Sequence, residues 1–120
     1  MIPKTRRRRR HRERPLHMHM AKRLVDACPN TMWFHVPNGE LREKAVAATL
    51  RQMGVRPGVA DFIILSRGRA IAAEVKDEES GRQSEDQKGF QRVWEANGGI
   101  YEVVKSSFDV DSIIFRYSLN

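Results

Sequence analysis

The spacing of the hydrophobic positions changes several times along this chain, and each change marks a new element. Over residues 16–28, LHMHMAKRLVDAC, apolar side chains recur every four positions, which predicts a helix with one apolar stripe, formed by Leu16, Met20, Leu24 and Cys28. Residues 32–36, MWFHV, are aromatic and β-rich and predict a strand. The turn sequence Pro37-Asn38-Gly39 ends that strand.

The rest of the chain alternates between helical and strand periodicity. It predicts a helix over about 40–53, strands over about 61–66 and 69–76, a helix over about 85–97 and a strand over 100–104. The final segment fits both spacings, and we favour a helix there. The order α-β-α-β-β-α-β-α predicts an α/β domain in which a mixed sheet is flanked by helices.

Three charged residues interrupt the apolar segment 58–76, GVADFIILSRGRAIAAEVK. If Arg67-Gly68 forms a two-residue hairpin turn, the numbers of paired residues add up to 135, so Asp61 lies opposite Glu74. Lys76 then lies on the same face. Two facing carboxylates repel each other, so we expect a divalent cation between them, with Mg²⁺ or Mn²⁺ suited to oxygen ligands. The alternative is a Lys76 salt bridge at the end of the sheet, with Asp61 merely ending a strand.

The positive charge of the chain is concentrated at its beginning. Residues 1–14, MIPKTRRRRRHRER, hold eight of the 22 Lys and Arg and one of the 15 Asp and Glu, which accounts for the whole net charge of +7. Because such a block repels itself and buries nothing, we expect a disordered arm over 1–15 and a domain over 16–120. The alternatives to a solvated tail are contact with an anionic membrane surface and, as we favour, binding of nucleic acid phosphates by Arg6, Arg7, Arg8, Arg9 and Arg10.

The cysteine content and the hydropathy indicate the cellular environment. Cys28 is the only cysteine, so no disulfide can form within the chain, and we expect an intracellular, reducing, cytoplasmic location. No apolar run approaches the roughly 20 residues of a membrane span, and no signal peptide pattern follows the basic start. We therefore expect no membrane partner.

The Asp61…Glu74-x-Lys76 pattern resembles the PD-(D/E)xK nuclease superfamily. Its surroundings resemble the VRR-NUC family over about residues 16–105, and the shared features are Pro37-Asn38-Gly39, Met53-Gly54-Val55, Gly58-x-x-Asp61, Glu74-x-Lys76 and Ser84-x-x-Gln87. The resemblance implies a restriction endonuclease-like core and a metal-dependent nuclease of replication, repair or recombination. It resembles the small stand-alone members of bacteria and phages, which implies a homodimer and cleavage of branched DNA such as Holliday junctions.

The resemblance also implies roles for single residues. Asp61, Glu74 and the Val75 carbonyl would ligate Mg²⁺ or Mn²⁺, and Lys76 would be the catalytic lysine. Gln87 would support the site from the following helix. Ser84 and Gln87 equally form a capping box, S-x-x-Q, at the start of that helix, and the two roles are compatible.

Two positions depart from the family pattern. Ala60 stands where the family usually has a proline, which removes a rigid turn but no chemistry. The first helix of the family often contributes a glutamate, and the predicted first helix has none before Glu40. His17 is the substitute that we expect, either as a metal ligand or as a hydrogen-bonded core histidine.

Further polar residues have both a functional and a structural interpretation. Asn38 and Gly39 open a predicted helix with Arg42 and Lys44 nearby, so this segment either holds a DNA phosphate or is a plain turn with Asn38 as N-cap. The acidic run 77–79 is expected to be a solvated loop rather than a second cation site. The aromatic side chains are expected in the core rather than as platforms for bases, namely Trp33, Phe34 and Trp94.

We therefore predict a metal-dependent DNA endonuclease in which Asp61 and Glu74 hold the cation and Lys76 assists. One alternative is a non-catalytic nucleic-acid-binding protein on a nuclease fold, against which the intact set of charged residues argues. The other is a sequence-specific, restriction-type nuclease, for which so short a chain has no separate target-reading domain.

Overall fold

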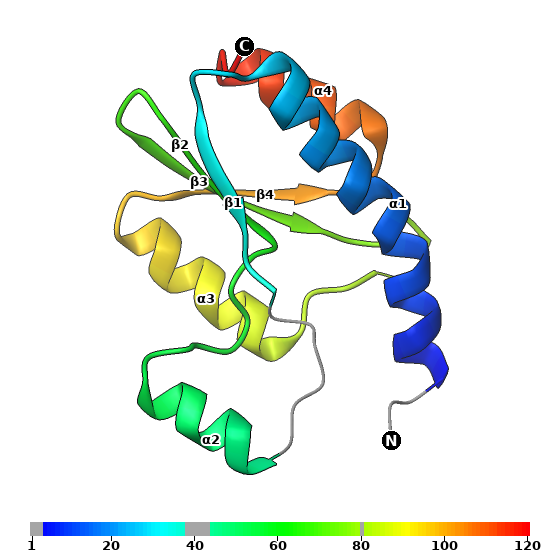
Figure 1. Cartoon of the computed structure of the whole chain (residues 1–120), viewed down its shortest axis with the longest axis vertical. Helices are drawn as coiled ribbons and strands as arrows, with labels where there is room; N and C mark the ends of the chain where they lie inside the picture. Colours follow the sequence, from blue (N-terminus) through cyan, green and yellow to red (C-terminus); the bar gives the residue numbers. More distant parts are fainter. Residues whose placement is uncertain (1–3, 38–43, 80) are drawn as a thin grey trace.

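A four-stranded sheet forms the centre of the molecule, with helices on both of its faces (Figure 1). The computed structural model describes residues 4–37, 44–79 and 81–120, with side chains from residue 12 onward. The strands are β1 (Met32–His35), β2 (Phe62–Ser66), β3 (Arg69–Val75) and β4 (Ile100–Val104), in the spatial order β1-β2-β3-β4. The first three are antiparallel neighbours, whereas β3 and β4 are parallel. The predicted α/β fold with a mixed sheet is confirmed.

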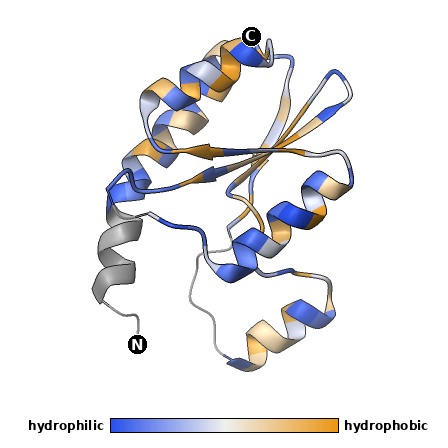
Figure 2. Cartoon of the chain, turned by 180° about the vertical axis from the view of Figure 1, so that it is seen from behind, coloured by the Kyte–Doolittle hydropathy of each residue, from blue (hydrophilic) through white to orange (hydrophobic). Residues whose placement is uncertain are grey.

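The described residues form four helices: α1 (Lys4–Ala27), α2 (Lys44–Gln52), α3 (Glu85–Ala96) and α4 (Ser107–Arg116). Helices α1 and α4 cover one face of the sheet, and α3 covers the other (Figure 1). Seen from behind, the central strands are largely hydrophobic, while hydrophilic residues run along α3 (Figure 2). The order of the elements agrees with the prediction, including the helical C-terminal segment. No helix in the described ranges has the length and apolar character of a membrane span.

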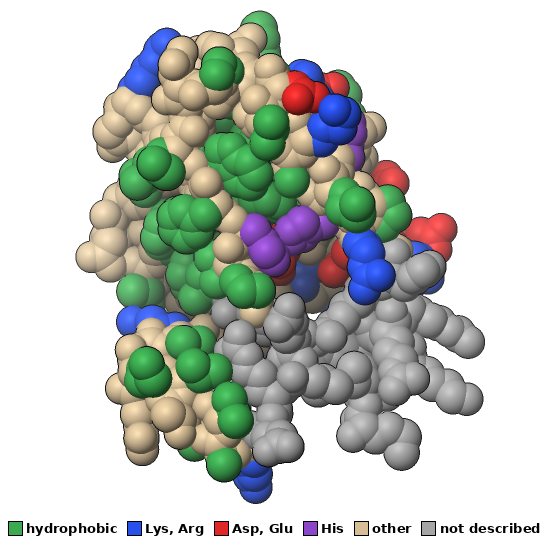
Figure 3. Space-filling model, in the orientation of Figure 1, with side chains coloured by type: hydrophobic (Ala, Val, Ile, Leu, Met, Phe, Trp, Pro, Cys, Tyr) green, Lys and Arg blue, Asp and Glu red, His purple; other side chains and the backbone are tan. Residues whose placement is uncertain are grey.

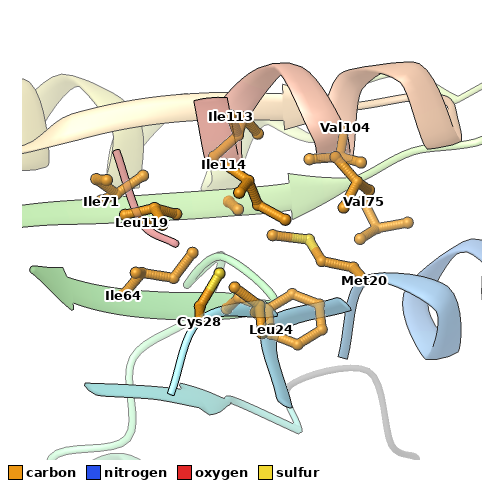
Figure 4. Packing of buried hydrophobic residues seen from close by; sticks show 13 residues of the cluster. Met20, Leu24, Cys28, Ile64, Ile71, Val75, Val104, Ile113, Ile114 and Leu119 are labelled. Carbon is orange, nitrogen blue, oxygen red and sulfur yellow. The ribbon is translucent and has the colours of Figure 1, made fainter. Parts of the chain in front are cut away.

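The main core lies between the sheet and the pair of helices α1 and α4 (Figure 4). The predicted stripe meets α4 above the strands, and the buried side chains are Met20 and Leu24 from α1, Cys28 directly after it, and Val110, Ile113 and Ile114 from α4. Burying an aliphatic side chain of this size contributes about 1.5–3 kcal/mol. The stripe therefore fixes how α1 lies on the sheet.

The hairpin of β2 and β3 has the predicted register. Ser66 pairs with Arg69, as the two-residue turn requires. Arg67 and Gly68 both have positive φ, 51° and 79°, which is the type I′ turn that fits the twist of a hairpin. This turn decides which face of the sheet each side chain of β2 and β3 takes.

Helix α1 begins at Lys4 and not after Pro15, so the predicted helix start is wrong. A proline inside a helix removes a backbone hydrogen bond and costs about 3 kcal/mol, which made Pro15 look like a boundary. Two contacts on the turn before Pro15 oppose this cost. Arg12 pairs with the Asp77 carboxylate at 3.0 Å, and Glu13 Oε1 accepts a hydrogen bond from Asp77 N–H at 3.1 Å. A separate, disordered arm over 1–15 stays a prediction.

Two further expectations concern β1 and α2. Phe34 was expected in the core, yet 49% of its surface is exposed, because α3 packs over β4 and not over the β1 edge of the sheet. Trp33 does pack against the core, and Trp94 donates a hydrogen bond to the Ile100 carbonyl at 2.8 Å. Helix α2 lies within the predicted range, and none of its residues is buried.

Candidate active site

Asp61, Glu74 and Lys76 meet at one end of the sheet, on the face that α3 covers. Asp61 directly precedes β2, Glu74 lies near the end of β3, and Lys76 follows β3. Continued by one residue, the hairpin register places Asp61 opposite Glu74. Asp61 Oδ2 accepts a hydrogen bond from Val75 N–H at 2.8 Å, which holds this carboxylate against β3.

Gly58 fixes the loop that leads to Asp61. Its φ is +77°, and a Cβ at this position would lie 2.3 Å from the carbonyl carbon of Asp86 and 2.7 Å from the backbone nitrogen of Gln87. No side chain fits in that space, so only glycine lets the loop rest on the first turn of α3. The Gly58-x-x-Asp61 spacing therefore joins one carboxylate of the site to the helix that carries Gln87.

Gln87 joins the carboxylate, the lysine and the helix start. Its Nε2 donates to Glu74 Oε1 at 2.7 Å, and its Oε1 accepts from Lys76 Nζ at 2.7 Å and from Ser84 N–H at 2.8 Å. Ser84 Oγ accepts from the Gln87 N–H at 3.1 Å, which completes the capping box. The capping box is confirmed, and the same amide contacts Glu74 and Lys76, while its role in supporting the site stays a prediction.

The second oxygen of Glu74 is the most unusual atom of the site. The side chain is only 4% exposed, and its Oε2 is buried without a hydrogen-bond partner among the described residues. Burial, and then the neighbouring Asp61 carboxylate, raise the pKa of Glu74 to about 9, although Lys76, with Nζ 3.7 Å from Oε1, acts in the opposite direction. A buried carboxylate oxygen without a donor needs either a proton or a cation.

This donor set fits a hard divalent cation. Asp61, Glu74 and the Val75 carbonyl offer oxygen atoms only, and oxygen is what Mg²⁺ and Mn²⁺ prefer. Within the described ranges, no three His, Cys, Asp or Glu side chains lie close enough together to hold a metal ion. Two carboxylates match Mg²⁺, which completes its shell with water and substrate oxygens. The assignment of these ligands stays a prediction.

His17 lies beside the site in aromatic surroundings. Its ring centroid is 4.3 Å from that of His35 and 4.5 Å from that of Phe62. Burial lowers the pKa of His17, the Asp61 carboxylate raises it, and His35 lowers it further. The ring is therefore packed, but it makes no hydrogen bond among the described residues, so the expected hydrogen-bonded core histidine stays a prediction. Its role as a metal ligand stays a prediction.

The first helix does carry a glutamate, contrary to the expectation that it has none. Glu13 precedes His17 by four residues on α1, so both lie on the same side of the helix. Its carboxylate accepts the Asp77 N–H hydrogen bond one residue beyond Lys76, and its charge raises the pKa of Glu74. The i, i+4 spacing with His17 was the available signal, and it was lost because the predicted helix began after Pro15.

Solved structures resemble this one, among them the following two. The first is described as a "VRR_NUC domain protein", with 27% sequence identity and a TM-score of 0.58 over 73% of this chain and 69% of that chain. The second is described as "VRR_NUC domain", with 22% identity and a TM-score of 0.63 over 88% of this chain and 97% of that chain. This chain has the VRR-NUC fold. No family model matches it, and no curated protein matches it significantly.

The match agrees with the resemblance in the sequence and supports assignment to the VRR-NUC family. In this VRR-NUC fold, Asp61, Glu74, Lys76 and Gln87 come together although they belong to a loop, a strand end and a helix. The hairpin pattern and the family resemblance together pointed to these four residues, and their roles stay predictions. What the sequence did not show is that Gln87 bridges Glu74 and Lys76.

Most of the predicted nucleic acid contacts lie outside the described side chains. Arg6 to Arg10 belong to α1 by their backbone, but their side chains lie outside the described part, as do Asn38, Gly39 and Arg42. Lys44 is exposed at the start of α2. Of the acidic run, Glu78 and Glu79 are exposed as expected, whereas Asp77 is buried because α1 covers it.

Proposed function

We propose that this protein is a metal-dependent nuclease that hydrolyses phosphodiester bonds in DNA. The observation that carries the proposal is the buried, donorless oxygen of Glu74, a residue that lies opposite Asp61 in the hairpin register and next to a lysine that Gln87 holds in place. The names of the two similar structures, which contain "VRR_NUC domain", support it.

Each residue of the site has a distinct role in the proposed reaction. Asp61, Glu74 and the Val75 carbonyl would hold Mg²⁺ or Mn²⁺, which when bound neutralises phosphate charge and lowers the pKa of a water molecule. Gln87 donates to Glu74 Oε1 and thereby leaves Oε2 for the cation. Lys76 Nζ, held by the same amide, supplies positive charge for the phosphoryl oxygens or orients the attacking water.

A cleavage assay with matched variants tests this function. Branched, flap and linear DNA are incubated with Mg²⁺, Mn²⁺ or EDTA and with Asp61→Asn, Lys76→Ala or, as control, Asp26→Asn. Asp26 is an exposed partner of Lys22 on α1, so its loss should leave cleavage unchanged. We expect Asp61→Asn and Lys76→Ala to lower the rate by about 100-fold or more, since each removes a group that acts on the reacting phosphate.

The outcomes of that assay are distinguishable. If Asp61→Asn and Asp26→Asn cut equally, the activity comes from another site or a contaminant. If the protein binds DNA but no metal supports cleavage, the non-catalytic binding protein is the correct alternative. Cutting at one defined sequence in linear DNA would favour the restriction-type alternative.

We further propose that branched DNA is the preferred substrate and that two copies of the chain act together. The family resemblance suggests both. The homodimer has support in exposed apolar side chains of the edge strand β1 and its neighbour β2, where Met32 pairs with Leu65 and both lie on the same face as Phe34. Figure 3 shows hydrophobic side chains gathered on one side of the molecule. Apolar patches of this kind mark interaction surfaces. Light scattering over a range of protein concentrations would measure the mass in solution.

A further inference from the structure

Besides the arginine run at 6–10, the chain has basic side chains around a hollow next to Lys76. A cavity of about 290 Å³ is lined by Lys76, Gly81, Arg82, Gln83, Val103 and Lys105. Lys76 directly follows β3 and Lys105 directly follows β4, and the Lys76 N–H donates to the Val104 carbonyl at 2.9 Å. The hollow therefore lies at the carboxyl ends of the two parallel strands, where open α/β sheets generally bind their ligands.

The loop after β3 is folded tightly against this hollow. Gly81 N–H donates to the Asp77 carbonyl at 2.9 Å, and a Cβ on Gly81 would lie 2.5 Å from the Asp77 backbone nitrogen and 2.9 Å from Lys76 Cβ. Gln83 anchors the far end of the loop, because its Nε2 donates to Gln91 Oε1 at 2.7 Å and to the Tyr101 hydroxyl at 3.1 Å. Arg82 is held between these two fixed points.

The lining carries positive charge, of which Lys76 is paired with Glu74. Of the described residues that line it, three are basic and none is acidic. Within the described part of the chain, the Arg82 and Lys105 side chains take part in no ion pair or hydrogen bond, whereas the Lys105 N–H is held by Asp109 Oδ2 at 2.8 Å. Of the nearby acids, Asp77 is paired with Arg12, Asp109 accepts from the Lys105 N–H, and Glu74 contacts Gln87 and Lys76 through Oε1.

Cations that a fold brings together around a hollow repel one another, and a bound anion removes that repulsion. Phosphate suits such a site, because Arg and Lys both bind phosphate oxygens through charge-assisted hydrogen bonds. Lys76 belongs to this lining and also to the carboxylate site. An anion bound here would therefore lie directly beside the proposed reaction centre.

We propose that this cavity binds one phosphate of the nucleic acid strand next to the reaction centre, with Arg82 and Lys105 as its ligands. The site rests on the proposed function for its role in catalysis, but binding itself requires no cleavage. Its ligands are other residues than those of the arginine run at 6–10 and of the 38–44 segment. Because it is built on the ends of two strands, it would fix the register of the strand relative to Glu74 and Lys76.

Binding in EDTA tests the site without catalysis. The Arg82→Gln/Lys105→Gln variant is compared with Lys22→Gln/Arg67→Gln, which removes the same charge from α1 and from the hairpin turn at the opposite end of β3. We expect the affinity for a labelled oligonucleotide to fall about tenfold only in the first variant. The slope of log K against log salt should fall by about 0.9 for a duplex or 0.7 for a single strand, the loss of one phosphate contact. Arg82→Lys/Lys105→Arg should restore both.

Methylphosphonates, which replace a charged phosphate of the oligonucleotide by a neutral group, identify the phosphate that the site binds. One is placed at each internal position in turn, and a parallel pair of oligonucleotides has or lacks the 5′-phosphate. An internal phosphate is identified if one methylphosphonate weakens the wild type but not Arg82→Gln/Lys105→Gln, and a terminal phosphate if removal of the 5′-phosphate does so. Either result supports the site. It is overturned if the variant binds like its control, or if every neutral position weakens both proteins equally.

The binding and cleavage experiments distinguish failure of the phosphate site from failure of the proposed nuclease function. A charge-dependent loss of binding in EDTA, with no cleavage by the wild type in Mg²⁺ or Mn²⁺, would keep the phosphate site and reject the nuclease. Normal cleavage by Arg82→Gln/Lys105→Gln, together with control-like binding, would reject the phosphate site and keep the nuclease. Both replaced side chains are exposed, so the fold should be unaffected, and thermal unfolding checks this.

Discussion

At the scale of single residues, Gln87 connects the stability of a helix to the geometry of a chemical site. Its oxygen closes the capping box with Ser84 and also holds Lys76, while its nitrogen holds Glu74. A glutamate at this position could still accept from the Ser84 N–H and from Lys76, but it could not donate to Glu74, because a carboxylate accepts hydrogen bonds and donates none. The two roles can therefore be separated by one substitution.

We predict that Gln87→Glu leaves the start of α3 intact and lowers cleavage by about 10–100-fold, the usual effect of losing a group that orients a metal ligand. Gln87→Ala should lower cleavage similarly and also cost about 1 kcal/mol of stability through the lost cap. Cleavage rates and urea unfolding of both variants provide the measurement. Equal activity of Gln87→Glu and the wild type would show that the Glu74 contact has no role in the reaction.

The pKa of Glu74, raised to about 9, predicts how the stability of the metal-free protein depends on pH. The ordinary value is 4.5, so the folded protein holds this proton more tightly than the unfolded chain. The stabilising contribution is therefore complete below about pH 4.5 and is lost as the pH rises through about 9. Glu74→Gln cannot ionise, and in EDTA at pH 9 it should exceed the wild type by about 1–3 kcal/mol in free energy of unfolding.

Calorimetry between pH 4.5 and 9 checks this prediction. The two proteins should be alike at the acidic end and diverge toward the alkaline end. Mg²⁺ should narrow the difference at pH 9, because a cation replaces the proton on the wild-type carboxylate. Stability curves that stay parallel over the whole range would contradict the assigned burial of Glu74.

At the scale of elements, the contact between the Gly58 loop and α3 decides whether the two halves of the site meet. Gly58→Ala should destabilise the protein by about 2–4 kcal/mol, since its Cβ would lie 2.3 Å from the Asp86 carbonyl carbon and no rotamer relieves a backbone clash. Gly54→Ala is the matched control. Gly54 also has a positive φ, +107°, but nothing lies within 4 Å of its added Cβ.

The control should therefore cost only about 1 kcal/mol, the strain of the left-handed conformation. Denaturant unfolding measures both variants, and cleavage should fall only in Gly58→Ala, because the loop positions Asp61. If both variants lose the same stability, the close approach to α3 has no energetic importance.

Features that local contacts determine could be predicted from the sequence, whereas features that depend on distant contacts could not. Arg67-Gly68 predicted the hairpin register, and hence the meeting of Asp61 with Glu74, because a two-residue turn fixes pairing locally. The start of α1 was not predictable in this way. The proline is a local signal for a boundary, whereas the contacts that oppose it join Arg12 and Glu13 to Asp77, more than 60 residues away.

The same limit applies to the donorless oxygen of Glu74 and to the basic cavity. Both depend on which side chains come together from separate elements, and no spacing in the chain contains that information. The Ser84-x-x-Gln87 motif was predictable only in part. Its cap follows from the sequence alone, while its contacts with Glu74 and Lys76 require the fold of the hairpin under α3.

At the scale of the whole molecule, the basic beginning of the chain should act separately from the site. A deletion of residues 1–11 tests this better than a longer one, because Arg12 and Glu13 contact Asp77. We predict weaker DNA binding and a salt slope that falls by about 0.9 for each duplex phosphate that an arginine contacts. Replacement of Arg6 to Arg10 by glutamine in the full chain is the control that keeps the length.

Titration of binding against salt in EDTA distinguishes the outcomes. The deletion removes six basic residues and the replacement five, so the two losses of slope should stand in about that proportion if charge alone is responsible. A slope unchanged from the wild type in both would reject a role of the arm in DNA binding. Cleavage of a short oligonucleotide should change little, since the arm contributes affinity and none of the reacting groups.

The tight turn at Arg67-Gly68 also has a kinetic consequence. A two-residue loop closes at small entropic cost, whereas β4 can join β3 only after the whole crossover 76–99 is ordered. The hairpin should thus form early in folding, with Asp61 and Glu74 facing each other before the α3 amide arrives. In this order of events the repulsion of the two carboxylates opposes the folding nucleus itself, and a divalent cation or a lower pH would accelerate refolding as well as stabilise the product.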